Sequence, residues 1–154
     1  MKFNMRTKHT TEELESALDN AFEYLQVTPE HQIITGSFVK TLKDIHVPTY
    51  EHSIRVGLKS IEVAEFIGII KPSDLFYPGL LHDIGKKEIR RELLDKRDWN
   101  EQDAEEMRPH AEIGAKIIEE YYEFSSWVIR NSHKLSKNGI GVLEKNPKFS
   151  VKPA

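Results

Sequence analysis

The sequence contains no cysteine and no long apolar run. Without cysteine there are no disulfides and no thiolate ligands, so only histidine and carboxylate side chains can hold a metal ion. No stretch approaches the ~20 apolar residues that a membrane span needs, and the N-terminal residues lack a signal peptide's apolar segment. With 38% hydrophobic and 31% charged residues, we expect a folded cytoplasmic protein with no membrane contact.

Apolar residues recur at helical spacing along most of the chain. Helices are predicted after Thr10 and Thr11, near Pro29, and over 49–69, 73–83, 100–122 (divided near Arg108-Pro109) and 125–135. The 49–69 helix is apolar on more than one face, which predicts that it is buried. Gly85 is expected to stop the 73–83 helix.

These segments predict an all-α protein with a single domain, a helical bundle over residues 1–154. Residues 1–47 are expected to form N-terminal helices, 48–138 the core, and 139–154 an irregular tail rich in glycine and proline. From Arg130 onward the chain has six lysines and arginines against one acid, Glu144. A tail of this charge is expected to be solvated or to attract phosphate groups.

Four of the seven histidines fall in predicted helices beside apolar residues: His52, His82, His110 and His133. Their separations of 30, 28 and 23 residues each equal about one helix plus a connection, so successive helices could bring them to one centre. Asp83 follows His82 and offers two oxygens that can bridge a pair of cations. The alternative is that these histidines are hydrogen-bonded core residues. His9, His31 and His46 lack such settings and are expected at the surface.

Three segments resemble successive motifs of one family: YEHSIRVG at 50–57, LLHDIGK at 80–86 and RPHAEIGAKII at 108–118. They are similar to motifs of the HD-domain metal-dependent phosphohydrolases. The third is closest to the HD-GYP branch, whose members hydrolyse cyclic dinucleotides. The resemblance covers about residues 48–138 and implies an all-α bundle of the HD-domain type with two or three metal ions. We expect two divalent ions, iron or manganese, with magnesium, nickel or zinc as alternatives.

Carried over by position, the resemblance implies metal ligands and a phosphate contact. The matched metal ligands are His52, His82, Asp83, His110 and His133. Lys86 matches a lysine that contacts the substrate phosphate. The HD-GYP branch usually has two adjacent histidines at the place of His133, and here Ser132 occupies one of those positions.

The chain departs from the family pattern in two places. The Gly-Tyr-Pro motif is missing, and Asn138-Gly139-Ile140-Gly141 stands nearby. The general pattern ends with a metal-binding aspartate on a later helix, but this chain has no aspartate after Asp103. Three explanations stay open: Glu144 substitutes, a partner chain supplies the ligand, or the first metal is held weakly.

The expected activity is metal-dependent hydrolysis of a nucleotide, a cyclic nucleotide or a related phosphodiester. Asp83 would bridge the ions and Lys86 would stabilise charge on the phosphoryl oxygens. Arg55, three residues after His52, can face the same cleft and bind phosphate, or can instead form a salt bridge to Glu51 or Glu62.

Two alternatives accompany this reading. One is a degenerate HD module that binds a nucleotide or a protein partner without turnover, and the other is a di-iron oxygenase of the same fold. The expected partner is a phosphate-containing small molecule, in particular a nucleotide. Lys87, Arg90 and Arg91 form a basic stretch that could bind nucleic acid. The favoured interpretation is that they form a solvated helix face. The sequence sets no oligomeric state.

Overall fold

The computed structural model describes residues 1–4 and 6–138, and for residues 133–138 it describes the backbone alone. Within these residues the chain is helical and contains no β-strand, which confirms the all-α prediction. The elements are α1 (Thr11–Tyr24), α2 (Pro29–Ile45), α3 (Val47–Phe66), α4 (Ser73–Leu81), the 3₁₀ helix η1 (Ile84–Glu88), α5 (Arg91–Asp95), α6 (Glu101–Met107), α7 (His110–Ile118) and α8 (Glu123–Asn138). The predicted tail, 139–154, lies outside the described residues. None of the described helices is both long enough and apolar enough to cross a membrane.

The first two helices begin where the sequence predicts. Thr10 accepts a hydrogen bond from the backbone of Glu13, and the Glu13 carboxylate accepts one from the backbone of Thr10, which is a capping box. Thr28 caps α2, and Pro29 occupies its first turn, where the missing N–H costs nothing.

A single residue, His46, separates α2 from α3 (Val47–Phe66). Its side chain accepts a hydrogen bond from the backbone N–H of Thr49 and so caps α3. The prediction that His46 lies at the surface is wrong, because it is only 8% exposed. His31 is exposed and His9 is half-buried. An imidazole in the capping position is unusual, and histidine spacing gave no signal of it.

The segment after α3 differs from the prediction in two ways. α4 ends at Leu81, and after the two turn residues His82 and Asp83 the chain enters η1, so Gly85 is inside a 3₁₀ helix rather than a stop signal. Arg91–Asp95 forms a short helix, α5, that the sequence did not predict. A small apolar cluster of Ile89, Leu93 and Met107 holds α5 against α6.

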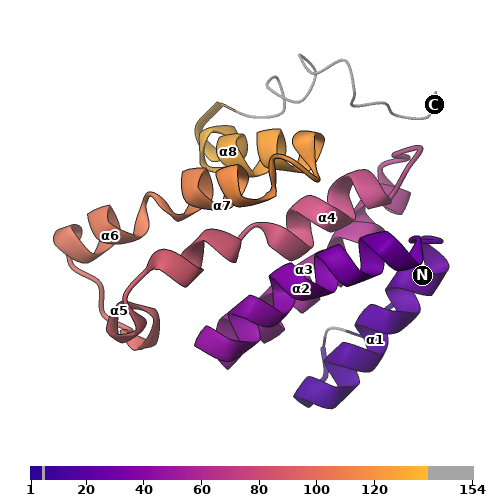
Figure 1. The fold of residues 1–154 in the computed structure, drawn as a ribbon, viewed down its shortest axis with the longest axis horizontal. Helices are drawn as coiled ribbons and strands as arrows, with labels where there is room; N and C mark the ends of the chain where they lie inside the picture. The colour runs from indigo at the N-terminus through magenta and orange to yellow at the C-terminus, as the bar shows by residue number, and fades with distance from the viewer. Residues whose placement is uncertain (5, 139–154) are drawn as a thin grey trace.

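The helices pack in two groups on either side of α4 (Figure 1). α1, α2 and α3 lie together on one side, and α3 contacts all three of α1, α2 and α4. α7 and α8 pair on the other side, with α8 on α4 and α7 on η1. α5 and α6 project at one end. The main core contains apolar residues from both groups, so the two groups of helices share one hydrophobic core.

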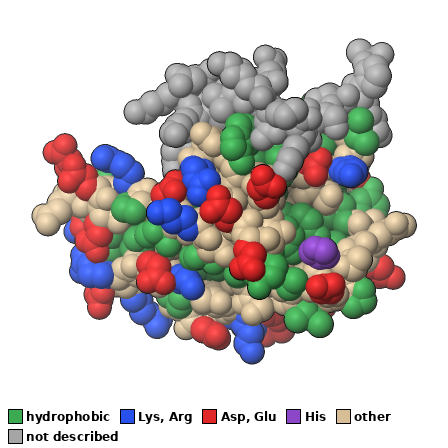
Figure 2. Space-filling model, turned by 45° about the horizontal axis from the view of Figure 1, so that its top comes forward, with side chains coloured by type: hydrophobic (Ala, Val, Ile, Leu, Met, Phe, Trp, Pro, Cys, Tyr) green, Lys and Arg blue, Asp and Glu red, His purple; other side chains and the backbone are tan. Residues whose placement is uncertain are grey.

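The prediction that the 49–69 helix is buried holds for only one face of α3. Ile54, Leu58 and Ile61 are buried, but Val63 is 42% exposed and Phe66 is 91% exposed. Figure 2 shows one face of the molecule on which hydrophobic side chains reach the surface between acidic and basic ones. The C-terminal half of α3 therefore contributes one face to the core and leaves apolar side chains uncovered on another.

Candidate metal centre

A close approach of α3 to α4 brings the first two motif histidines together. A Cβ at Gly57 would meet Leu80 atoms at 3.1–3.3 Å, and one at Gly79 would lie 3.2 Å from the carbonyl oxygen of Val56. Two small residues thus let the helices touch almost backbone to backbone. His52 on α3 and His82 at the end of α4 consequently stand with ring centroids 5.3 Å apart.

A second close approach joins η1 to α7. A Cβ at Gly85 would lie 1.8 Å from the carbonyl oxygen of His110 and 2.6 Å from the backbone nitrogen of Gly114. Only glycine fits between these backbone atoms. The contact fixes Asp83, two residues before Gly85, opposite the first turn of α7, where His110 begins that helix.

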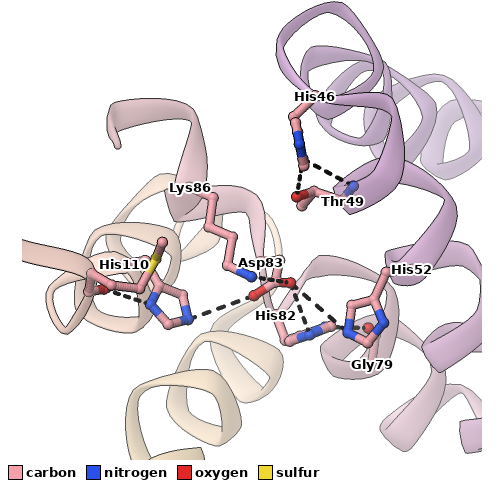
Figure 3. A network of polar contacts seen from close by, with 9 residues as sticks. His46, Thr49, His52, Gly79, His82, Asp83, Lys86 and His110 are labelled. Atoms are coloured by element: carbon pink, nitrogen blue, oxygen red, sulfur yellow. Dashed lines mark hydrogen bonds and ion pairs between the residues drawn. The ribbon is translucent and has the colours of Figure 1, made fainter. Parts of the chain in front are cut away.

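Asp83 stands at the centre of these side chains, and its two oxygens face different imidazoles (Figure 3). Oδ2 lies 3.3 Å from Nε2 of His82 and 4.0 Å from Nε2 of His52. Oδ1 lies 3.5 Å from Nε2 of His110. The carboxylate is only 2% exposed, and Nζ of Lys86 lies 2.8 Å from Oδ2.

Backbone carbonyls fix the orientation of two of the imidazoles. Nδ1 of His82 donates to the carbonyl oxygen of Gly79 at 2.7 Å, and Nδ1 of His110 donates to that of Met107 at 2.7 Å. Because a carbonyl can only accept, each Nδ1 carries a proton, and Nε2 is the ring nitrogen that faces Asp83 and can offer its lone pair to a metal ion. This is the arrangement by which proteins hold metal-binding histidines.

The electrostatic environment keeps the carboxylate charged and His52 neutral. Burial alone would raise the pKa of Asp83, but the hydrogen bond and charge of His82 and the ammonium of Lys86 outweigh it and hold that pKa well below its usual range. Burial, and then the neighbouring His82, lower the pKa of His52. An ionised carboxylate and a neutral imidazole are the forms in which these two side chains bind a metal ion.

The donor set suits a divalent ion. One ligand atom each from His52, His82 and Asp83 lie within 4.8 Å of one another. Imidazole nitrogen with carboxylate oxygen suits iron, manganese, nickel or zinc. His110 is not part of this group, and its Nε2 faces the other carboxylate oxygen, Oδ1. His133, the further predicted ligand, lies in α8 with its side chain outside the described part of the structure.

Comparison with known proteins agrees with this geometry. The family model for the HD domain matches residues 49–147. The chain belongs to the HD-domain family. HD domains bind divalent metals and are usually metal-dependent hydrolases. No curated protein and no solved structure matches the chain.

The candidate metal centre of His52, His82 and Asp83 opens into a cleft of about 600 Å³, within the usual range of ligand pockets. Lys86 and His110 line it together with His52, His82 and Asp83. Arg55 is not among the described residues that line it, and instead pairs with Glu51 at 3.6 Å. Ser132 lines the cleft from α8. Glu144, the suggested substitute ligand, lies outside the described residues.

Sequence reasoning missed the rest of the lining, which is mainly apolar. These residues are Val56, Val63, Leu75, Pro78, Val128 and Ile129, with Lys59, Ser60 and Gly79. A signal was present for part of it, since Val56 and Ser60 follow His52 at intervals of four residues and share its face of α3. Apolar periodicity does not by itself distinguish residues that face a cleft from those that face the core.

Proposed function

We propose that this HD domain hydrolyses a phosphoester with the help of divalent metal ions, and that its substrate is a nucleotide, a cyclic nucleotide or a related phosphodiester. The observation that carries the proposal is the position of the Asp83 carboxylate. Its two oxygens face imidazoles from opposite sides of a cleft, which is the arrangement needed to bridge two ions. A pair of divalent ions, when bound, supplies Lewis acidity to a phosphoryl oxygen and to a water molecule.

The side chains of the chain itself position the substrate. His82 and His110 are locked by their carbonyl partners, so their Nε2 atoms need no reorganisation. Lys86 projects into the cleft and can donate to phosphoryl oxygens as negative charge grows on them. Arg55 pairs with Glu51 and lies three residues after His52 on α3, and we propose that it meets a phosphate that extends outward from His52.

The test combines metal analysis with hydrolysis of bis-(p-nitrophenyl) phosphate. Protein purified without chelator is expected to carry metal and to gain turnover with added Mn²⁺ or Fe²⁺. Asp83→Asn keeps the shape of the side chain but removes the only anion described in the centre, so both metal and turnover should be lost.

Asp95→Asn is the matched control. Asp95 also contacts an imidazole, that of His46, but it is not among the described residues that line the cleft. Metal content and turnover should remain at wild-type levels in this variant. Nucleotide binding without metal or turnover would identify a binding module instead, and metal-dependent oxygen uptake would identify an oxygenase.

A further inference from the structure

The part of the cleft that extends away from the metal ligands is built from three helical stripes. α3 contributes Val56 and Val63 beyond His52, and α4 contributes Leu75 and Pro78 before His82. α8 closes the third side with Val128 and Ile129. Of these six, Val56, Leu75 and Val128 are half-buried, so their apolar surface is available to a ligand.

The hydroxyl groups of this region already donate within the protein. Ser60 donates to the carbonyl oxygen of Val56, and Ser132 donates to that of Ile129, both at 2.8 Å. Lys59, at the edge, pairs with Glu62 at 2.5 Å. Among the described lining residues there is no phenylalanine, tyrosine or tryptophan to stack a base, and no asparagine or glutamine to read its edge.

The length of the apolar region can be estimated from helix geometry. At a rise of about 1.5 Å per residue, Val63 stands about 16 Å beyond His52, and Leu75 stands about 10 Å from His82. Because α3 and α4 run in opposite directions through the centre, both stripes extend toward the same end of the cleft. The space beyond the phosphate therefore accommodates an aryl group or a medium-length alkyl chain.

We infer that this region binds the organic group of the substrate through apolar contact, so that the site selects phosphoesters by the apolar size of that group and does not discriminate between nucleobases. The inference rests on the proposed function for the position of the phosphate. It adds how the rest of the substrate is held: among the nucleotides and phosphodiesters proposed above, those that present more apolar surface to the cleft bind more tightly.

Calorimetric titration of the Mn²⁺-loaded protein with methyl-, butyl- and hexylphosphonate tests the inference without turnover. Each buried methylene is expected to tighten Kd by about fourfold until the chain reaches the end of the cleft. Adenosine, guanosine, cytidine and uridine monophosphates are expected to bind within about threefold of one another. Equal Kd values for the three phosphonates, or a preference above tenfold for one base, would overturn the inference.

Val128→Asn places an amide in the apolar region while keeping a similar helix propensity. It should reduce the gain from methyl- to hexylphosphonate at least threefold and leave methylphosphonate binding unchanged. Val47→Asn is the control, since Val47 is 42% exposed and is not among the described lining residues. An unchanged gain in folded Val128→Asn would contradict the inference, and the wild-type series decides if the variant does not fold.

The two proposals fail in distinguishable ways. Binding that depends on chain length without hydrolysis of any ester would preserve the apolar site and remove the proposed activity. Hydrolysis of bis-(p-nitrophenyl) phosphate with phosphonate affinities independent of chain length would preserve the activity and remove the apolar site.

Discussion

The ammonium of Lys86 and a metal ion require the same oxygen atom. Nζ of Lys86 lies 2.8 Å from Oδ2 of Asp83, the oxygen that also faces His82 and His52. In the metal-free protein this contact balances a buried negative charge. A divalent ion at Oδ2 would repel the ammonium, which would then be available to a phosphoryl oxygen in the cleft.

Lys86→Met is therefore expected to bind Mn²⁺ more tightly than the wild type. A charge-assisted hydrogen bond contributes about 1.5–3 kcal/mol, so removing the competitor should lower the Kd for Mn²⁺ by roughly 10- to 100-fold. The metal-free variant should be less stable than metal-free wild type, because Asp83 loses its counter-charge. Calorimetry measures the first effect and thermal unfolding the second.

Lys87→Met is the matched control for Lys86→Met. Lys87 is the next residue and pairs with Glu88 at 4.0 Å, and it is not among the described lining residues of the cleft. Its replacement should change neither the Kd for Mn²⁺ nor the stability of the metal-free protein beyond experimental error. Weaker Mn²⁺ binding by Lys86→Met would show that the lysine supports the ion rather than competing with it.

At the scale of residues, the centre was predicted in part because the motif residues are polar and stand at helix-sized intervals. His52, His82, Asp83 and His110 do meet, as that spacing indicates. The contact of Arg55 with Glu51 was one of two alternatives that helical spacing allows. The role of His46 could not be predicted, since its hydrogen bond to Asp95 at 3.0 Å joins residues 49 positions apart.

At the scale of elements, the start of α3 depends on the cap that His46 provides. The imidazole accepts from the backbone of Thr49, contacts its hydroxyl at 2.7 Å, and reaches Asp95 on α5 with its other nitrogen. One residue therefore closes α2 with its backbone N–H, which donates to the carbonyl oxygen of Leu42, and uses its side chain to cap α3 and contact α5.

His46→Ala should destabilise the protein by about 1–2 kcal/mol, because the cap of α3 and the contact with Asp95 are lost together. His46→Asn restores a good capping residue and should recover roughly half of that loss, leaving the contact to Asp95 unreplaced. Urea unfolding monitored by circular dichroism measures both. Equal loss in the two variants would show that the bond to Asp95, rather than the cap, carries the stability.

The contact between η1 and α7 has no room for a side chain at Gly85. Gly85→Ala forces a methyl group against the backbone of His110 and Gly114, and neither backbone can rotate away. Overpacking of this kind costs about 3 kcal/mol, which corresponds to a fall in Tm of roughly 6–12 °C for a chain of this size. Metal analysis should also show a loss of the ion that His110 would bind.

Gly36→Ala is the matched substitution without a clash. A Cβ at Gly36, inside α2, meets nothing within 4 Å. Alanine favours the helix by about 0.5–1 kcal/mol relative to glycine, so this variant should be slightly more stable than the wild type. A stable Gly85→Ala with unchanged metal content would mean that η1 and α7 can separate without affecting the centre.

Most helices could be predicted from the sequence, because capping residues and apolar spacing are local signals. α1, α2 and the division of the 100–122 segment into α6 and α7 follow from them. Gly85 was misread as a stop because a helix end and a close packing contact both favour glycine. α5 was missed because its five residues are too few to show a period.

For the whole molecule, the centre joins segments that are distant in sequence. His52 comes from α3 and His110 from α7, which lie on either side of α4, and Asp83 comes from the turn between α4 and η1. An ion bound there stabilises the folded chain only, because the unfolded chain cannot bring these ligands together.

Added Mn²⁺ should therefore raise the Tm of the protein. At a concentration 100 times the Kd, a ligand specific for the folded state adds about 2.7 kcal/mol, which corresponds to roughly 5–10 °C for a chain of this length. Differential scanning calorimetry with Mn²⁺ and then with excess chelator measures the shift and its reversal. Asp83→Asn should show no shift, and an equal shift in that variant would place the stabilising ion elsewhere.

The pairing of Lys86 with Asp83 also sets an order of events during biosynthesis. A newly made chain can bury this aspartate at once, because its counter-charge is supplied three residues along the same chain. Folding does not have to wait for a scarce ion, and the finished protein can acquire its metal later from whatever supply the cell offers. We therefore expect this HD domain to fold without metal, so that binding of an ion would be a separate and later step.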